Sequence, residues 1–315
     1  MNPKNPSYHQ DSALIQRILD QNHWGKIDSL RYPTRGSINP AVIVNERYVI
    51  RFDVLYDALN EPPRFQGEAR AYAYLAPTSV PVPRCLCLDL SRTLCPLPFM
   101  VTSMLAGEAL IDLWPKLSTN QQQHLSQQAG AYLAQIHQQK IDDGFYKLCE
   151  KELHSFQTWP AYVENYFKTY LPILKNQLNP SDLQTATLCL QKAQPLLAET
   201  VPLARLIHGD YHFENLLAQP EKLTAIIDFE HAKAADPAWD FRLRDQWESE
   251  CSGSLAGILN AYGPLSDHFE TRIRLYEWLK SIDDMDWFHF QGDQNRFKQA
   301  YQAYFQRLNA LKEAL

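Results

Sequence analysis

Two short polar segments of the sequence, 208–215 and 228–230, contain residue types that could carry out chemistry. Asp210 and Asn215 are five residues apart, and Asp228 directly follows an apolar strand-like run. Phosphoryl transfer requires a carboxylate that orients an acceptor hydroxyl and takes its proton, and oxygen ligands that hold magnesium. Kinase catalytic loops place an Asn ligand five residues after the catalytic Asp. The spacing predicts a kinase-like centre with Asp210 as base and with Asn215 and Asp228 as Mg²⁺ ligands.

The residues His208, Asp210 and His212 also allow a second interpretation. A His-x-Asp-x-His pattern could ligate zinc or a metal pair in a metal-dependent hydrolase. No later segment supplies further His and Asp ligands in a matching pattern, and the order of elements fits a kinase better. For His208 we expect a structural role, bracing the loop by hydrogen bonds, ahead of direct proton transfer.

The elements that must position these residues divide the chain into two parts. The first part is predicted to contain helices and strands in mixed order: a helix over 11–21, strands over 41–44 and 47–52, a helix over 66–75, and strands over 85–88 and 99–102. The second part is predicted to be mainly helical, with helices over 119–139, 161–170, 181–197, 255–261, 268–282 and 296–311. One patch of short strands surrounds the two polar segments.

This pattern predicts an α+β, bilobal fold. A small N-terminal antiparallel-sheet lobe, residues 1–104, would bind the nucleotide. A larger, mainly helical C-terminal lobe, residues 105–315, would carry the catalytic loop and the acceptor site.

The small lobe offers candidate phosphate contacts. Gly36 and Ser37 lie in a turn-rich segment before a hairpin and could cover phosphates with backbone N–H groups, although a plain turn explains them equally well. Arg51 ends the next strand, where a kinase places its phosphate-contacting Lys, and Glu68 lies early in the following helix. Without this context, a strand Arg and a helix Glu would usually form a surface pair.

Together the motifs resemble those of the aminoglycoside phosphotransferase and choline kinase family, small-molecule kinases with a protein-kinase-like fold. The resemblance spans roughly residues 29–240. It rests on the catalytic-loop pattern His208-Gly-Asp210-x-His212-x-x-Asn215-Leu-Leu, the metal segment Ile227-Asp228-Phe229-Glu230, the Asp236-Pro-Ala-Trp-Asp240 that follows, a Leu133-Ala-Gln-Ile-His137 helix end, and a hinge strand from Pro98.

The resemblance implies ATP or GTP as co-substrate, Mg²⁺ as cofactor, and a hydroxylated small molecule as acceptor. It assigns Asp210 as catalytic base, Asn215 and Asp228 as metal ligands, and Arg51 with Glu68 as the phosphate-positioning pair. It places adenine against the backbone near Ser103 and Met104. The sequence departs from the family at several positions: Arg51 replaces the commoner Lys, Phe213-Glu214 the frequent Pro-Gly, and Glu230 a small residue or Trp, while Gly36 is the only glycine of the phosphate loop.

These departures leave a catalytically weak pseudokinase, a nucleotide-binding module on the same fold, as an alternative. The intact positions Asp210, Asn215 and Asp228 argue for an active enzyme.

The acceptor is less well defined than the nucleotide site. Carboxylates and aromatics gather in the second part, at Asp283, Asp284, Asp286, Trp278, Trp287, Phe288 and Phe290. They would suit a cationic acceptor such as an aminoglycoside or an amino alcohol. Alternatively, the acidic pair caps or solvates a helix end and the aromatics belong to the core, which is the interpretation we favour. A homoserine-like compound or a sugar fits equally well.

Composition narrows the remaining possibilities. The 315 residues carry 36 acidic and 30 basic side chains, a net charge of −6, which argues against a nucleic-acid partner. No apolar run is long enough to span a membrane. The six cysteines form no CxxC pair and are expected to be reduced thiols, so the expected location is cytoplasmic. The sequence leaves the oligomeric state open.

Overall fold

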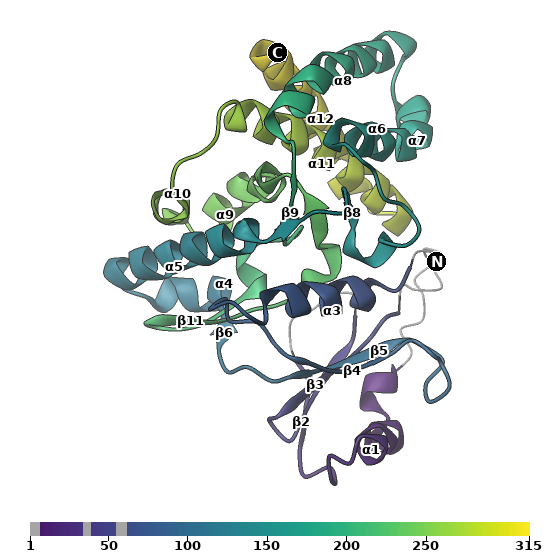
Figure 1. The fold of residues 1–315 in the computed structure, drawn as a ribbon, viewed down its shortest axis with the longest axis vertical. Coiled ribbons are helices and arrows are strands. Elements are labelled where there is room, and N and C mark those ends of the chain that lie inside the picture. The colour runs from purple at the N-terminus through teal and green to yellow at the C-terminus, as the bar shows by residue number, and fades with distance from the viewer. Residues whose placement is uncertain (1–6, 34–38, 55–61) are drawn as a thin grey trace.

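The computed structural model describes residues 7–33, 39–54 and 62–315. Figure 1 shows a small lobe built on a twisted sheet and a larger lobe made mostly of helices. The bilobal α+β fold expected from the sequence is confirmed. Within the described ranges, no helix is long and apolar enough to cross a membrane.

The small lobe is built on a five-stranded antiparallel sheet with the strand order β1-β2-β3-β5-β4. Its strands are β1 (Leu30–Arg31), β2 (Ala41–Val44), β3 (Tyr48–Phe52), β4 (Cys85–Asp89) and β5 (Phe99–Ser103). The turn between β2 and β3 uses Asn45 and Glu46 at φ 55° and 47°. Two positive φ values are typical of the turn whose twist matches a hairpin.

The alternation of side chains along β3 decides where Arg51 points. Tyr48, Ile50 and Phe52 are buried in a core shared with α1 (Ser12–Gln21), so Arg51 projects from the other face of the sheet, toward α3 (Arg64–Leu75). Figure 1 shows α1 and α3 on opposite sides of the sheet. A one-residue shift in the pairing of β3 would turn Arg51 away from α3.

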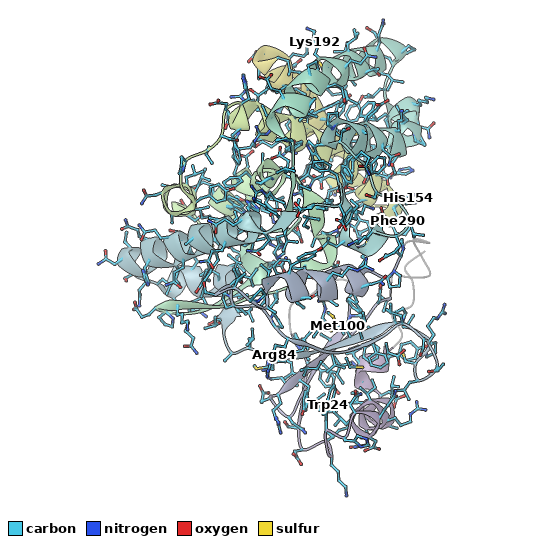
Figure 2. The ribbon with its side chains drawn as sticks, viewed as in Figure 1. Trp24, Arg84, Met100, His154, Lys192 and Phe290 are labelled. Carbon is cyan, nitrogen blue, oxygen red and sulfur yellow. The ribbon has the colours of Figure 1, made fainter. Side chains whose placement is uncertain are left out.

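Two hydrophobic cores correspond to the two lobes, but α3, which follows the small-lobe strand β3 in the chain, packs in the larger core. The smaller core draws its buried members from residues 14–101, whereas Phe65, Tyr72 and Leu75 of α3 belong to the larger core together with Met100 of β5. Figure 2 places Met100 on the α3 side of the sheet and Trp24 on the other side. The helix α3 therefore anchors the small lobe on the large one, and we keep residue 104 as the proposed lobe boundary.

The large lobe is held by long helices. The helix α5 (Thr119–Gln138), which is the longest one predicted from the sequence, begins with a capping box formed by Ser118 and Gln121. The other helices are α4 (Leu110–Leu113), α6 (Trp159–Thr169), α7 (Leu171–Gln177), α8 (Pro180–Thr200), α9 (Arg244–Glu250), α10 (Ser254–Tyr262), α11 (Phe269–Gln291) and α12 (Gln294–Ala314).

Two small sheets, where the sequence predicted one patch of strands, frame the polar segments. One sheet has the order β11-β10-β6 and the other the order β7-β9-β12-β8. Their strands are β6 (Glu108–Ala109), β7 (Lys140–Ile141), β8 (Tyr146–Lys147), β9 (Ala204–Ile207), β10 (Leu216–Gln219), β11 (Lys222–Ile226) and β12 (Lys233–Ala235). Segment 208–215 runs from β9 to β10, and Asp228 lies between β11 and β12, so each polar segment connects one sheet to the other.

Gly130 provides a test of the close packing between α5 and α10. A Cβ atom at Gly130 would lie 2.2 Å from the carbonyl oxygen of Ile258, so a side chain there must push the helices apart. We expect Gly130→Ala to lower the free energy of unfolding by about 1–3 kcal/mol, measured by urea denaturation. His124→Ala, at an exposed position of α5, is the control. Unchanged stability of Gly130→Ala would contradict this packing.

Candidate active site

The loop between β9 and β10 brings Asp210 and Asn215 together, as their spacing predicts. The Asn215 Nδ2 atom donates to the backbone oxygen of Asp210 at 3.0 Å and lies 3.4 Å from its Oδ2. Gly209, at φ 85°, makes the turn before them, and a Cβ atom there would lie 2.0 Å from the carbonyl oxygen of His231. Only glycine fits this close backbone contact.

A buried carboxylate, that of Asp240, holds the start of this loop. Its two oxygens accept the backbone N–H groups of His208 and Gly209 at 2.8 and 2.7 Å. His137, at the end of α5, contacts the same carboxylate through Nε2 at 3.0 Å and contacts Tyr262 through Nδ1 at 2.8 Å. Burial alone would raise the pKa of Asp240, but the hydrogen bond from His137 and nearby positive charge lower it below its ordinary value.

The ring of His208 braces the loop. Its Nε2 atom lies 3.0 Å from the carbonyl oxygen of Ile227, and its Nδ1 atom accepts the N–H of Asp210 at 3.2 Å. Burial lowers the pKa of His208, so the ring is neutral, with the proton on Nε2. Both nitrogens are thus in use, and no group of three His, Cys, Asp or Glu residues in the described chain could hold a metal ion. The hydrolase interpretation gains no support.

The carboxylate of Asp210 contacts His212, two residues further along the same loop. The His212 Nε2 atom is 3.4 Å from Asp210 Oδ2, and its Nδ1 atom is 3.7 Å from Oε1 of Glu250 in α9. Burial would raise the pKa of Asp210, but contact with His212 and neighbouring histidines lowers it below its ordinary value. The side chain of Asp210 remains 37% exposed. A carboxylate that is both ionised and accessible is what a base acting on a hydroxyl requires.

Arg51 joins the two lobes at the other polar segment. Its Nη1 atom contacts both carboxylate oxygens of Glu68 at 2.8 Å, and its Nη2 atom contacts Oδ1 of Asp228 at 2.8 Å. Tyr72, one turn further along α3, donates its hydroxyl to Glu68 at 2.5 Å. Burial would lower the pKa of Arg51, but Asp228 and Glu68 raise it well above its ordinary value. The expected Arg51–Glu68 pair therefore exists as a buried ion pair that also includes Asp228.

Glu230 lies in the site and contacts Asn39, Arg51 and Arg64, which the sequence analysis did not predict. It is 7% exposed, accepts the side-chain amide of Asn39 at 2.8 Å, and lies 3.4 Å from Arg51 and 3.6 Å from Arg64. Burial and the neighbouring charge of Asp228 raise the pKa of Glu230 to about 8. The only signal in the sequence was its departure from the family pattern two residues after Asp228.

Of the remaining nucleotide candidates, the structure describes Ser103 and Met104. Gly36 and Ser37 fall outside the described residues. Ser103 ends β5, and its N–H donates to the carbonyl oxygen of Arg84 at 2.9 Å. The N–H of Met104 donates to the carbonyl oxygen of Arg47 at 2.8 Å. Both N–H groups are thus engaged within the lobe, so an adenine beside this segment would have to use other backbone groups.

The residues that could hold Mg²⁺ are Asn215 and Asp228. Asn215 directs its Nδ2 atom to Asp210, which leaves its Oδ1 atom as the one suited to a cation. The backbone of Asp228 is in the left-handed region at φ 68°, and its side chain is 32% exposed. The N–H of Ile227 donates to the carbonyl oxygen of Asn215 at 3.0 Å, which keeps the two segments adjacent. This pair of oxygen donors fits a hard cation.

The acidic and aromatic residues of α11 are mostly engaged in the large lobe. Asp284 pairs with Lys280, and Asp283 accepts the hydroxyl of Tyr170 at 2.6 Å. Trp278 is fully buried. The sequence interpretation that the acidic pair caps a helix end is wrong, because α11 continues to Gln291 and the pair lies inside the helix.

The bilobal fold is that of a kinase-like phosphotransferase. Arg51 joins Glu68 and Asp228 between its lobes, and Asp210 lies on the adjacent loop. The chain belongs to the phosphotransferase enzyme family, whose model matches residues 29–307. This assignment confirms the family and the enzyme class expected from the sequence.

Solved structures of similar fold are aminoglycoside phosphotransferases. Aminoglycoside phosphotransferase APH(4)-Ia is 16% identical, with a TM-score of 0.71 over 96% of this chain and 99% of its own. The GDP complex of aminoglycoside 2'-phosphotransferase-IIIa is 18% identical, with a TM-score of 0.70 over 96% and 99%. The gentamicin complex of APH(2")-IIa is 19% identical, with a TM-score of 0.70 over 94% and 96%. No curated protein sequence gives a significant match.

Asp240 allows the hold on the loop to be tested. We expect Asp240→Ala to lower the free energy of unfolding by about 3–5 kcal/mol, because it leaves two buried N–H groups and His137 without their acceptor. Urea denaturation measures the change, with Asp245→Ala at an exposed position of α9 as control. Equal losses in the two variants would show that the buried contacts of Asp240 contribute nothing beyond those of a surface carboxylate.

Proposed function

We propose that this protein transfers the γ-phosphate of ATP or GTP to a hydroxyl group of a small molecule. The observation that carries the proposal is the Arg51 ion pair, which links Glu68 of the small lobe to Asp228 of the large lobe beside the Asp210–Asn215 contact. Arg51, Glu68 and Asp228 are far apart in sequence, and their contact brings together residue types that phosphoryl transfer requires. Membership in the phosphotransferase family supports the same conclusion.

Asp210 is the proposed base. Its ionised carboxylate accepts the proton of the acceptor hydroxyl as the hydroxyl oxygen forms its bond to the γ-phosphorus. The bond between that phosphorus and the β–γ bridging oxygen breaks, and the nucleoside diphosphate leaves with the electron pair. The proton then passes from Asp210 to solvent. His212 keeps the carboxylate oriented and ionised during this cycle.

Arg51 is the proposed phosphate contact, oriented by Glu68. In the structure its guanidinium also contacts Asp228, so binding of a phosphate requires Arg51 to exchange or share that partner. Asn215 and Asp228 are the proposed Mg²⁺ ligands, and a bound Mg²⁺ would neutralise charge on the phosphates. The nucleotide is proposed to lie between the lobes, with Gly36 and Ser37 over its phosphates and the Ser103–Met104 segment beside its base.

The acceptor is a hydroxylated small molecule in this proposal, with aminoglycosides and amino alcohols among the candidates. The aminoglycoside enzymes of similar fold support that range by fold alone. A cytoplasmic location is proposed because ATP is available there and because the described residues contain no disulfide.

The first test concerns Asp210. Asp210→Asn should lower the rate of acceptor-dependent ATP or GTP consumption in the presence of Mg²⁺ by about 100-fold or more, while the nucleotide affinity is retained. Turnover against a panel of hydroxylated small molecules is measured together with nucleotide affinity by calorimetry. Asp142→Asn, at an exposed position, is the matched control. Full turnover in Asp210→Asn would show that Asp210 is not the base. Nucleotide binding without turnover in the wild type would favour the pseudokinase alternative.

The second test concerns Asp228. Asp228→Ala should weaken Mg²⁺-dependent nucleotide binding by about tenfold or more, because one proposed metal ligand is lost. Calorimetry at several Mg²⁺ concentrations separates this effect from a change in metal-free nucleotide binding, and Asp142→Ala is the control. If the variant and the wild type bind Mg·ATP equally well at every Mg²⁺ concentration, Asp228 is not a metal ligand.

A further inference from the structure

Two cationic side chains lie at the base of the catalytic loop, on its large-lobe side. Lys233 Nζ donates to the carbonyl oxygen of His231 at 3.1 Å. Arg242 donates to the carbonyl oxygens of Gly209 and Trp239 at 2.6 and 2.9 Å. Gly209 immediately precedes Asp210, so Arg242 contacts the backbone that positions the proposed base. Lys233 contacts the His231 carbonyl group that packs against Gly209. In the described part of the chain, neither cation forms an ion pair with a carboxylate.

The two cations share one aromatic neighbour. Lys233 Nζ lies 5.3 Å, and Arg242 Cζ 5.2 Å, from the centroid of the Trp239 ring. Trp239 is buried, and Lys233 itself is only 6% exposed. Attraction to the ring compensates part of the cost of burying charge, but a cation–π contact contributes less than an ion pair with a carboxylate.

The other charged groups around Lys233 already have partners. Asp283 of α11 accepts the hydroxyl of Tyr170, and Asp240 accepts the backbone of the catalytic loop. Lys147, on the neighbouring strand β8, pairs with Glu150. Burial, followed by the positive charges of Arg242 and Lys147, lowers the pKa of Lys233 to about 7, and Asp283 and Asp240 only partly offset this.

A buried lysine next to a like charge destabilises a fold, and a methionine of similar volume would pack there at lower cost. Proteins retain such groups mainly where function requires them, most often where a ligand of opposite charge completes the site. Lys233 and Arg242 make their contacts entirely within the large lobe, whereas Arg51 faces the small lobe. They are thus separate from the cation assigned to the nucleotide phosphates, which leaves the acceptor as the ligand of this reaction that they could contact.

We propose that Lys233 and Arg242 bind an anionic group, a carboxylate or a phosphate, carried by the hydroxylated acceptor. This inference rests on the proposed function, because it assigns the acceptor class of the same reaction. It differs from the cationic acceptor suggested by the carboxylates of α11. Two of those carboxylates already have partners, since Asp284 pairs with Lys280 and Asp283 accepts the hydroxyl of Tyr170.

The experiment compares compounds that share a carbon skeleton but differ in charge. Gluconate, glucitol and glucamine form one such set, and glycerate, glycerol and serinol form another. Binding is measured by the dose-dependent shift in Tm of the wild type, Lys233→Met and Lys233→Gln. We expect the carboxylate member of at least one set to bind the wild type best, and its affinity to fall about tenfold or more in both variants.

Two internal controls separate a ligand-binding role from a structural one. Lys192→Met removes an exposed lysine of α8, at the far end of the large lobe in Figure 2, and should change nothing. Without ligand, Lys233→Met should have a Tm equal to or above that of the wild type, since a buried ammonium is removed. A lowered Tm in both Lys233 variants, with the carboxylate preference intact, would indicate a structural lysine and overturn the inference.

The same compounds are tested in the nucleotide-consumption assay, which keeps the two proposals apart. Transfer to some acceptor, with neutral or ammonium members bound as well as the carboxylates, overturns the anionic acceptor and leaves the proposed function standing. Lys233-dependent carboxylate binding with no transfer to any compound supports the anion site and counts against the proposed function. Lys233-dependent binding and transfer to the same carboxylate support both.

Discussion

The buried guanidinium of Arg51 is tolerated only because carboxylates from both lobes surround it. An isolated charge at this depth would cost several kcal/mol, so Glu68 and Asp228 must be in place for the lobes to close on each other. The same contact spans the two lobes, since Glu68 lies on α3, which packs on the large lobe, and Arg51 lies on β3 of the small-lobe sheet. It also links the nucleotide side of the site to the relative position of the lobes, since any group that competes for Arg51 acts on the contact between them.

Backbone geometry on the other side of the site is over-determined in the same way. Gly209 and Asp228 both have positive φ values. Gly209 donates its N–H to the buried carboxylate of Asp240, and the side chain of Asp228 accepts a hydrogen bond from Arg51. Asp240 fixes the first turn, and His208 joins the two turns through Ile227. Strained backbone persists where surrounding contacts leave no alternative, and here those contacts keep Asp210 within reach of Asn215.

Sequence reasoning succeeded where chemistry follows from spacing along the chain. The interval between Asp210 and Asn215 and the strand before Asp228 predicted their adjacency, and the positions of Arg51 at a strand end and Glu68 early in the next helix predicted their pairing. It failed where partners come from distant elements. Nothing local indicates that Lys233 is buried, because its burial comes from the pairing of β12 with β8 and β9. Likewise, Asp283 of α11 accepts the hydroxyl of Tyr170, which lies between α6 and α7, and a scan along one helix cannot anticipate that partner. Asp284 and Lys280, by contrast, form an i,i+4 pair within α11.

The two cationic centres of the site thus differ in a way that bears on what each can bind. Arg51 is matched by carboxylates, so a phosphate there must compete with Glu68 and Asp228 and gains little from removing unpaired charge. Lys233 and Arg242 donate to carbonyl oxygens and lie beside the Trp239 ring, and within the described residues neither pairs with a carboxylate. An anion there would therefore gain from a positive charge that Asp283 and Asp240 offset only in part. In the proposed assignment, charge compensation before any ligand arrives therefore distinguishes the nucleotide contact of Arg51 from the acceptor contact of Lys233 and Arg242.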